Sequence, residues 1–328
     1  MSSGNSLYLV TGGSGFLGSN LVKALVDRGE RVRVFDNNFR GSRAKIGAYI
    51  ERVEFIEGDV RDRGAVENAV KGVEILCHLA FINGTRYFYE MPREVLDVGV
   101  RGTMNFLEAA IDGGVSDFIF ASSSEVYQTP PICPTPETVP MSIPDPRNPR
   151  YSYGGAKLIG EILCFNYGRG RFRRTVVFRP HNVYGPDMGF EHVIPEFIVR
   201  MRNAMDTVRA SELAFPIQGS GEETRAFCEI RDFTDGLVRV IDEGLDQNVY
   251  NIGNEKEVSI RELALLIARK MGCEIRLESG PLRAGGTPRR CPDITKLRAL
   301  GYQPRLDLPT GLDASIEWYS QGAARRGK

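Results

Sequence analysis

The sequence predicts an α/β protein with a doubly wound parallel sheet and a smaller mixed α/β lobe. Strand-like apolar runs alternate with helical patterns, as in parallel strands joined by crossover helices. The runs lack strict alternation, as expected of strands covered on both faces. From about Pro186 onward, helices and short strands mix. We therefore expect a sheet domain over residues 1–185 and a second lobe formed mainly by residues 186–328, with the chain free to cross between them.

The expected elements follow in order along the chain. Strands are predicted at Leu7–Val10, Arg31–Phe35, Val53–Ile56, Val73–Leu79, Asp117–Phe120 and Thr175–Phe178. Helices are predicted from the first strand to about Arg28, over Pro92–Ile111, from Tyr153 to about Tyr167, and over Ser259–Met271. The last of these is clearly amphipathic, and Ser259 with Glu262 makes a capping box at its start.

Residues 128–150 interrupt the alternation of strands and helices. This segment holds eight of the 18 prolines. Because proline lacks a backbone donor and has a fixed φ, the segment can form neither a helix interior nor a central strand. A loop of this length inside a compact domain is usually functional.

The composition excludes several classes of function. Lysine plus arginine (42) balances aspartate plus glutamate (42), so no global field favours nucleic acid or an anionic membrane. The six cysteines lack Cys-x-x-Cys spacing and the three histidines are scattered, so we expect free thiols and no metal site. No apolar run reaches about 18 residues, and the N-terminus has no signal-peptide pattern. A cytoplasmic protein is expected.

A glycine-rich turn lies between the first strand and the first helix. Gly12, Gly15 and Gly18 let the backbone turn tightly and approach a pyrophosphate, which a helix N-terminus favours. Asp36 ends the second strand about 20 residues later, where a carboxylate binds the adenosine ribose 2′-hydroxyl. A carboxylate there would repel a 2′-phosphate. The pattern therefore predicts a Rossmann-type site for NAD rather than NADP.

Other residues near this site leave some choices open. Arg40 and Arg43 keep NADP possible as the cofactor. Asp59 follows the third strand and could either bond the adenine amino group or cap the next helix. The cofactor-binding residues predicted from the turn and the strand ends are Gly12, Gly15, Phe16, Leu17, Gly18, Asp36, Asn37 and Asp59.

Tyr153 and Lys157 are four residues apart and therefore share one face of the expected helix. An ammonium can lower the pKa of a neighbouring phenol, and a phenolate can take a proton from an alcohol. The spacing alone also arises by chance. A serine run, Ser122–Ser124, follows the fifth strand at the edge where doubly wound sheets bind ligands. With the glycine turn, these residues indicate a redox site for an alcohol.

This constellation resembles the extended short-chain dehydrogenase/reductases, and more narrowly the NAD-dependent nucleotide-sugar epimerase/dehydratase family. The resemblance covers nearly the whole chain. Its motifs are Thr11-Gly-Gly-Ser-Gly-Phe-Leu-Gly18, Gly58-Asp-Val60, His78-Leu-Ala80, Arg179-Pro-His-Asn-Val-Tyr-Gly-Pro186, Thr224-Arg-Ala-Phe227 and Pro288-Arg-Arg-Cys-Pro-Asp293.

The resemblance implies a role for each matched catalytic residue. Tyr153 takes the proton of the sugar hydroxyl while hydride moves to the nicotinamide. Lys157 bonds the nicotinamide ribose and lowers the pKa of the tyrosine. The resemblance adds Val60, Leu79, Ala80, Tyr153 and Lys157 to the predicted cofactor-binding residues. Ser123 bonds the reacting oxygen.

The resemblance also implies substrate-binding residues. Asn182 resembles the residue that holds the substrate backbone near the diphosphate. Arg225 and Arg283 resemble the arginines that bind the diphosphate, with Arg290 as an alternative to Arg283. The predicted substrate-binding set is Asn83, Ser124, Asn182, Arg225 and Arg283.

Glu125 bears on the choice between reactions. Simple 4-epimerases of the family need only the serine and tyrosine, and sugar 4,6-dehydratases commonly carry Thr-Asp-Glu. GDP-mannose dehydratases and UDP-glucuronate decarboxylases carry Thr-Ser-Glu. This chain has Ser123-Ser124-Glu125, so the aspartate is missing. Glu125 could transfer a proton, orient a carboxylated sugar or be a loop carboxylate without a role. Gln128 replaces a usual glycine, and Phe81–Glu90, which contains Asn83, is atypical, so both favour an uncommon sugar.

Three hypotheses follow. The first is a nucleotide-sugar epimerase that recycles NAD in place, with Ser123, Glu125, Tyr153 and Lys157 as its catalytic set. The second is a dehydratase or a UDP-glucuronate-decarboxylase-like enzyme that uses Glu125, and the third is a dinucleotide-binding regulator without catalysis. Family members often dimerise through a four-helix bundle, so we also expect a homodimer, formed here by the Pro92–Ile111 and Tyr153 helices.

Overall fold

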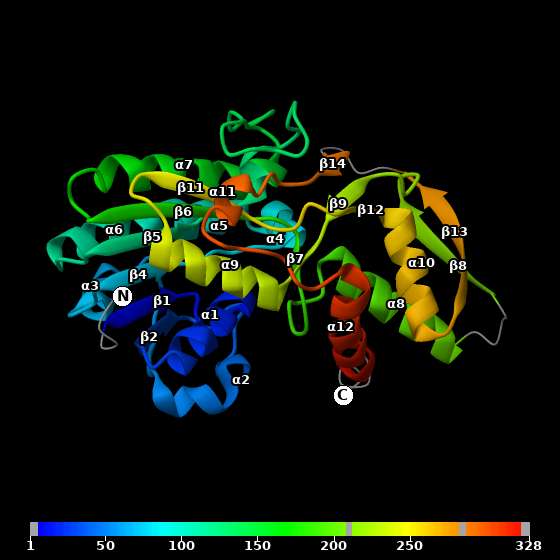
Figure 1. Cartoon of the computed structure of the whole chain (residues 1–328), viewed down its shortest axis with the longest axis horizontal. Coiled ribbons are helices and arrows are strands. Elements are labelled where there is room, and N and C mark those ends of the chain that lie inside the picture. Colours follow the sequence, from blue (N-terminus) through cyan, green and yellow to red (C-terminus); the bar gives the residue numbers. More distant parts are fainter. Residues whose placement is uncertain (1–5, 208–211, 282–286, 323–328) are drawn as a thin grey trace.

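A parallel sheet forms the centre of the larger lobe (Figure 1). The computed structural model describes residues 6–207, 212–281 and 287–322. Within these residues the strand order is β11-β6-β5-β4-β1-β2-β3. The strands are β1 (Leu7–Thr11), β2 (Arg31–Asp36), β3 (Glu54–Glu57), β4 (Ile75–His78), β5 (Asp117–Ala121), β6 (Arg174–Pro180) and β11 (Asn248–Ile252). The predicted doubly wound sheet is confirmed, and β11 is an additional strand.

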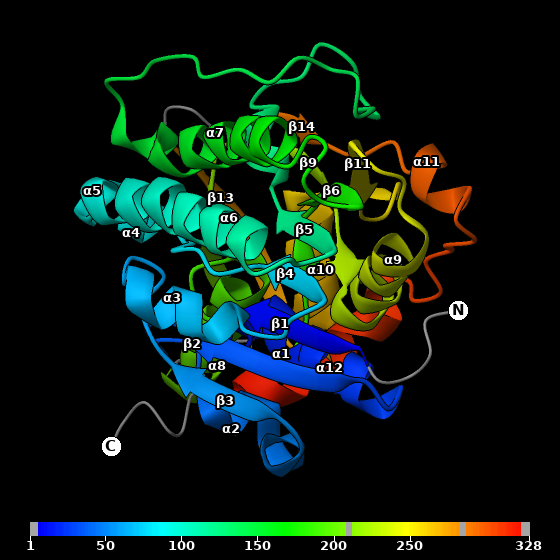
Figure 2. The ribbon, with the colours of Figure 1, turned by 90° about the vertical axis from the view of Figure 1, so that its left-hand side faces the viewer.

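Helices cover both faces of this sheet (Figure 2). Along β1, Tyr8 and Val10 point into one apolar core, and Leu7 and Leu9 point into the other, because successive side chains of a strand alternate. The first core lies under α1 (Phe16–Asp27) and α9 (Ile230–Glu243). The second lies under α3 (Arg63–Val70), α6 (Gly102–Asp112) and α7 (Ser152–Tyr167). A strand buried on both sides is largely apolar, as β1 is, in which only Thr11 is polar.

The predicted helix over Pro92–Ile111 is present as one continuous helical segment. It consists of α5 (Pro92–Leu96), a π-helical turn over Asp97–Arg101, and α6. Shorter helical elements of this lobe are α2 (Arg43–Ile46), α4 (Thr85–Glu90), α11 (Thr295–Arg298), and 3-10 turns at Gly47–Arg52, Ser124–Val126 and Pro149–Tyr151. None of the helices in the described ranges is both long and apolar enough to cross a bilayer.

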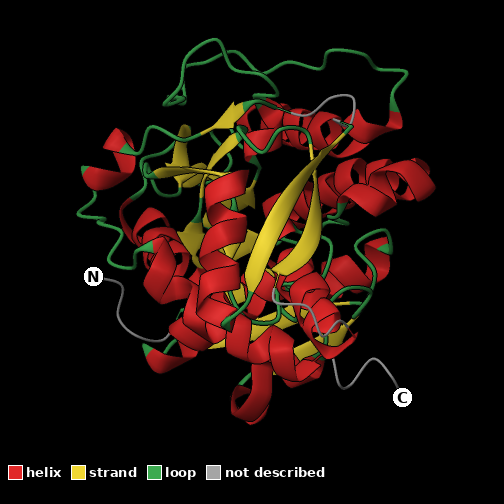
Figure 3. Cartoon of the chain, turned by 90° about the vertical axis from the view of Figure 1, so that its right-hand side faces the viewer, coloured by secondary structure: helices red, strands yellow, loops and turns green. Residues whose placement is uncertain are grey.

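The smaller lobe, which faces the viewer in Figure 3, has its own apolar core. Along β8 the side chains of Leu213, Phe215 and Ile217 are buried and alternate with exposed ones. At the start of α10, Ser259 and Glu262 form the predicted capping box. The elements are α8 (Val193–Thr207), β8 (Glu212–Gln218), β9 (Thr224–Ala226), β12 (Glu257–Ser259), α10 (Ile260–Met271), β13 (Glu274–Gly280), β14 (Arg289–Arg290) and α12 (Leu308–Gly322).

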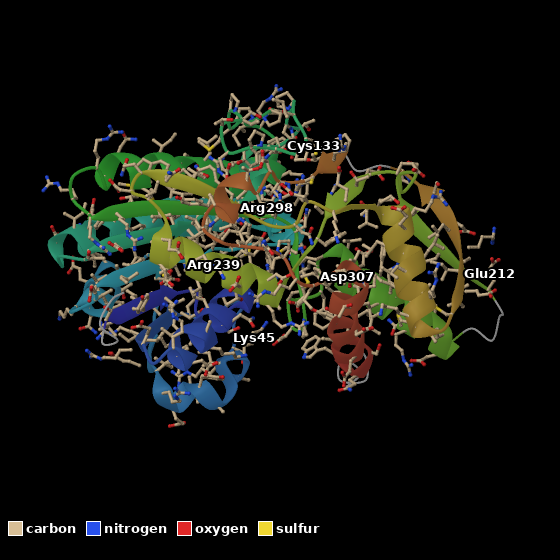
Figure 4. The ribbon with its side chains drawn as sticks, viewed as in Figure 1. Lys45, Cys133, Glu212, Arg239, Arg298 and Asp307 are labelled. Atoms are coloured by element: carbon tan, nitrogen blue, oxygen red, sulfur yellow. The ribbon has the colours of Figure 1, made fainter. Side chains whose placement is uncertain are left out.

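The chain passes between the lobes more than once. After α8 and β8 in the smaller lobe, it returns through α9 to β11, which pairs in parallel with β6 in the large sheet. A short pair, β7 (Val183–Tyr184) with β10 (Cys228–Glu229), marks the crossing. Lys45, labelled in Figure 4, donates from its Nζ to the carbonyl oxygen of Asp187 at 2.7 Å and so joins the two sides.

The proline-rich segment is a loop fixed by the C-terminal part of the chain. The backbone N–H of Thr135 donates to the carbonyl of Cys291 at 2.8 Å, and that of Asp293 donates to the carbonyl of Thr135 at 2.9 Å. Cys133 consequently lies close to β14 (Figure 4). Apart from the turns at Ser124–Val126 and Pro149–Tyr151, no helix or strand lies between β5 and α7 in the described chain, as the prolines predict.

Candidate active site

A cleft of about 640 Å³ opens between the two lobes at the carboxyl edge of the sheet. Most of the residues singled out from the sequence line it. They are Gly12, Gly15, Phe16, Leu17, Gly18, Asp36, Asn37, Val60, Leu79, Ala80, Asn83, Ser123, Ser124, Glu125, Tyr153, Lys157, Asn182 and Arg225. Asp59 lies beside the cleft rather than in its described lining, and Arg283 lies outside the described residues.

The glycine turn has the shape required to approach an anion. Gly12 has a φ of 68°, and a Cβ added there would lie 2.8 Å from the backbone nitrogen of Ala80. A Cβ on Gly18 would lie 2.1 Å from the carbonyl oxygen of Gly12. Gly15 caps α1 without a side chain, so the first N–H groups of this helix remain available to a pyrophosphate. The turn therefore fits a dinucleotide.

Asp36 is oriented by two backbone donors. The N–H of Ser14 donates to Oδ2 at 2.9 Å, and the N–H of Asn38 donates to Oδ1 at 2.8 Å. Each carboxylate oxygen has further acceptor capacity, so Asp36 can also receive ribose hydroxyls. The carboxylate thus faces the cleft in a fixed orientation.

Arg40 and Arg43, which left NADP open, are both paired with carboxylates. Arg40 is 3.0 Å from Glu191 across the cleft, and Arg43 is 3.5 Å from Glu57. Neither arginine is therefore a free partner for a 2′-phosphate. Together with Asp36, this arrangement fits NAD.

Asp59 is held by its neighbours. Arg61 donates to both carboxylate oxygens, at 2.9 and 2.7 Å, and these bonds lower the pKa of Asp59. Asn37 donates to it at 3.4 Å. The expectation that Asp59 could cap the following helix is wrong, because Asp62 caps α3 by accepting from the N–H of Ala65. Contact with adenine stays a prediction.

Tyr153 lies at the start of α7 and is almost fully buried. Its hydroxyl lies near enough to Ser123 for that side chain to affect its pKa, and its ring stacks on Phe88 with centroids 5.0 Å apart. Burial raises the pKa of Tyr153; the Ser123 side chain and the charge of Arg40 lower it, and the charge of Glu125 raises it further. The structure brings the predicted Ser123 and Tyr153 together.

Lys157 follows one turn later on the same face of α7. Its Nζ donates to the carbonyl oxygen of Ala121 and lies 3.1 Å from the centroid of the Phe81 ring. Burial lowers the pKa of Lys157 well below its usual value, although Cys164 and Glu161 raise it. The expected lowering of the Tyr153 pKa by this lysine is not seen, because burial dominates and the ammonium is directed to Ala121 and Phe81.

Glu125 lies among three arginines. Arg290 donates to its Oε1 at 2.9 Å, and Arg150 lies 3.6 Å from its Oε2. Burial raises the pKa of Glu125, but the charges of Arg290, Arg150 and Arg225 outweigh burial and hold the pKa below its usual value. The carboxylate is therefore ionised and already engaged by cations.

The wall of the smaller lobe carries the predicted Asn182 and Arg225. Asn182 has a φ of 41° and donates from Nδ2 to the carbonyl of Ala226 at 3.1 Å. Burial, and then the positive charge of Arg290, lower the pKa of Arg225 to about 10. In the described chain the buried Nε of Arg290 has no partner, so its N–H can donate to an anionic oxygen of a ligand.

Gln128 explains why glycine is usual at its position. Its φ is 52°, in the left-handed region that glycine adopts most readily. Its side chain donates to the carbonyl of Glu125, and its own carbonyl accepts from Thr287 at 3.0 Å. Gln128 therefore links the Ser124–Val126 turn to the segment that carries Arg290.

Sequence reasoning missed Arg150 and gave Arg290 only as an alternative. Arg150 belongs to the proline-rich segment, where no periodicity marks a functional position. Its place three residues before Tyr153 was the one available signal. Arg290 reaches the site because residues 287–293 pack on the proline-rich loop.

A Rossmann sheet with a serine, tyrosine and lysine gathered beside its dinucleotide turn defines a class of NAD-binding enzymes. Residues 8–253 match the NAD dependent epimerase/dehydratase family. The chain belongs to this family, and its cofactor is NAD.

Known relatives carry different activities on this framework. The chain is 30% identical to the UDP-N-acetyl-alpha-D-glucosaminuronate decarboxylase of Bacillus cytotoxicus, covering 95% of this chain and 97% of that enzyme. The UDP-glucose 4-epimerase of Thermotoga maritima, solved with UDP-glucose, superimposes with a TM-score of 0.84 at 28% identity, covering 96% and 99%. The dTDP-glucose 4,6-dehydratase DesIV of Streptomyces venezuelae, solved with NAD, gives 0.85 at 26%, covering 97% and 98%. Family membership alone therefore does not choose the reaction.

Proposed function

We propose that this protein is a nucleotide-sugar epimerase that oxidises a sugar hydroxyl to a ketone and reduces it again on the opposite face. The observation that carries the proposal is the grouping of Ser123, Tyr153 and Lys157 in one cleft beside the dinucleotide turn, with Lys157 one helical turn after Tyr153. Bound NAD would accept the hydride and return it. No other acid or base is required for epimerisation at the oxidised carbon.

Each residue has a defined part in this reaction. In its phenolate form Tyr153 takes the hydroxyl proton as the C–H hydrogen leaves as hydride. The Ser123 hydroxyl donates to the oxygen that becomes the carbonyl. Lys157, fixed by Ala121, would bond the nicotinamide ribose of bound NAD. In the reverse step Tyr153 returns the proton, so proton and hydride are conserved over the cycle.

The state of Glu125 disfavours a 4,6-dehydratase. Elimination of water needs a carboxyl group that can release and accept a proton near the sugar. Glu125 is ionised and paired with Arg290 at 2.9 Å, which makes it a weak base. Epimerisation does not use such a group and is compatible with this pairing.

The substrate class follows from the charges of the opposite wall. Arg225 and Arg290 present guanidinium groups, which suit the oxygens of a diphosphate. Asn182 lies beside them and is held by the backbone of β9. We infer a nucleoside-diphosphate sugar, with its diphosphate on this wall and its sugar toward Tyr153.

A decarboxylase is the second candidate. Arg150, Arg225 and Arg290 surround a single carboxylate, Glu125, so the cluster has an excess of positive charge. Such a cluster suits a sugar that carries its own carboxylate, and a relative at 30% identity decarboxylates a glucosaminuronate. Oxidation beside a carboxylate makes CO2 a good leaving group, so Glu125 need not act as a base in this reaction either.

The deciding experiment is product analysis. The holoenzyme is incubated with UDP-, dTDP- and GDP-linked hexoses and hexuronates, and products are identified by NMR and mass spectrometry. An epimerase gives a product of unchanged mass with one inverted carbon and no accumulation of NADH. Loss of CO2 establishes the decarboxylase, loss of water the dehydratase, and stoichiometric NADH release overturns internal recycling of the cofactor.

We further propose that the protein is a homodimer. Four large apolar side chains are exposed on α5 and α7, namely Leu96, Ile159, Ile162 and Tyr167. A second copy of the same face would cover them in a four-helix arrangement. A cytoplasmic location stays a prediction.

A further inference from the structure

Close to Tyr153 and Lys157, a buried ion pair connects α7 to β6, beside the end of β5 that Ser123 follows. Glu161 lies one turn after Lys157, and Arg179 belongs to β6. Arg179 donates to Glu161 from Nε at 2.8 Å and from Nη2 at 2.6 Å. Only 2% of the Glu161 side chain and 4% of the Arg179 side chain are exposed. A bidentate pair so deeply buried has a fixed geometry.

This pair is attached directly to the catalytic loop. Ser122 donates from its hydroxyl to Oε1 of Glu161, and Lys157 donates to the carbonyl of Ala121, the preceding residue. Two consecutive turns of α7 thus hold two consecutive residues at the end of β5. Ser123 is the next residue in the chain, so its position depends on both contacts.

The same pair also extends to the proline-rich loop. Nη1 of Arg179 donates to the hydroxyl of Tyr127 at 2.6 Å, and that hydroxyl donates to Oδ1 of Asn251 at 2.9 Å. Asn251 in turn donates from Nδ2 to the carbonyls of Thr135 and Asp293, at 2.9 and 3.2 Å. One connected set of buried bonds therefore joins the Ser122–Ser123 turn to the loops around Arg290.

We propose that Glu161 and Arg179 are positioning residues that set the Ser123 hydroxyl against Tyr153 during hydride transfer. They do not line the cleft in the described chain, so they act through Ser122 and the end of β5. The inference rests on the proposed function only in requiring that a sugar hydroxyl is transiently oxidised beside Tyr153. It holds equally whether the ketosugar is epimerised or decarboxylated afterwards.

The test compares Ser122→Ala and Glu161→Gln with a matched control. Asp117→Asn removes another buried carboxylate, which pairs with Arg173 and Arg174 at the opposite end of β5. The rate of nicotinamide reduction in a single turnover, kcat, KM and NAD occupancy are measured, together with the unfolding temperature. We expect Ser122→Ala and Glu161→Gln to lower the reduction rate and kcat by roughly tenfold to a hundredfold, with KM and NAD occupancy unchanged. Asp117→Asn should lower only the unfolding temperature.

Two further measurements keep the proposal falsifiable. Arg179→Lys retains the positive charge but cannot make both bonds to Glu161. It should therefore also slow hydride transfer, but by less than Glu161→Gln, and it replaces Glu161→Gln as the test if Glu161→Gln folds poorly. Wild-type rates of hydride transfer in folded Ser122→Ala and Arg179→Lys would overturn the inference, as would equal losses of kcat in Asp117→Asn. Failure of the epimerase proposal would instead appear in the wild-type product, independently of these ratios.

Discussion

Arg290 and Glu125 are separated by 165 residues in sequence, yet Nη1 of the arginine lies 2.9 Å from Oε1 of the glutamate. The contact joins the smaller lobe to the Ser124–Val126 turn, because Arg290 lies on β14 and Glu125 lies in that turn. It also keeps the glutamate ionised. One ion pair therefore both connects the two lobes and helps to keep Glu125 ionised.

Glu125→Gln should destabilise the protein at neutral pH. The folded pKa of Glu125 is lowered, so its carboxylate contributes stability above its ordinary pKa of 4.5 and loses it as the pH falls through the folded value. At pH 7 we expect a loss of about 2 kcal/mol in the free energy of unfolding, shrinking as the pH falls below 4.5. Urea unfolding at several pH values measures this. Glu257→Gln is the control, because its partner Arg289 is largely exposed; equal losses in both variants would contradict the prediction.

Tyr153→Phe should abolish most turnover while leaving the fold intact. Loss of a proton-transferring hydroxyl reduces rates by about 10²–10⁴-fold. The ring still stacks on Phe88, so the unfolding temperature should change little. Steady-state turnover with the best nucleotide sugar provides the measurement. Tyr167→Phe, on the same helix but partly exposed, should behave as wild type; turnover by Tyr153→Phe close to that of the control would remove this residue from the mechanism.

Asp36→Asn should weaken NAD binding and reduce discrimination against NADP. The amide cannot accept as strongly from the ribose hydroxyls, and the repulsion of a 2′-phosphate disappears. We expect NAD affinity to fall by about tenfold or more, as for loss of a charged hydrogen bond, while NADP affinity rises. Calorimetric titration of apoenzyme with both dinucleotides tests this. Asp59→Asn is the comparison, since Arg61 already occupies that carboxylate, and an equal change in the NAD/NADP ratio there would argue against a special role for Asp36.

Two glycines of α7 should respond to alanine in opposite directions. At Gly155 the nearest atom to an added Cβ is 3.9 Å away, so Gly155→Ala should stabilise the helix by about 1 kcal/mol. At Gly160 the Cβ would lie 2.4 Å from the buried ring of Phe120, so Gly160→Ala should destabilise by about 1–3 kcal/mol. Thermal unfolding of both variants provides the comparison. A stabilised Gly160→Ala would show that the packing between α7 and β5 is looser than described.

Ile162→Glu should produce a monomer. Ile162 is 50% exposed on α7, and a charge there would be costly to bury against a second copy. Light scattering coupled to size-exclusion chromatography distinguishes the two states. Leu265→Glu, at a similarly exposed position on α10, should remain dimeric. A wild-type monomer at micromolar concentration would refute the proposed interface.

Local signals in the sequence predicted the sheet and half of the site. Tyr153 and Lys157 share a helix, and Asp36 ends its strand, so local spacing indicated them once the glycine turn and the serine run were taken into account. Glu125 was identified, but its state was not, because Arg150 and Arg290 reach it through the packing of two irregular segments. For Asp59 the sequence suggested adenine contact or a helix cap, but not the ion pair that it forms with Arg61.

Long-range topology was also beyond the sequence patterns. The residues of β11 form a short run, Asn248–Ile252, whose pairing with β6 depends on the path of the whole smaller lobe. Gln128 gave a related difficulty: its left-handed backbone is stabilised by bonds to Glu125 and Thr287, which no local pattern reveals.

The return of the chain to β6 has a consequence for synthesis. A polypeptide emerges from the ribosome N-terminus first, and domains fold as their residues become available. Here the edge of β6 stays open until Asn248–Ile252 has been translated, by which time α8 and β8 have already emerged. The two lobes must therefore mature together on the nascent chain, and a product truncated before β11 would expose an unpaired strand edge and be prone to aggregate.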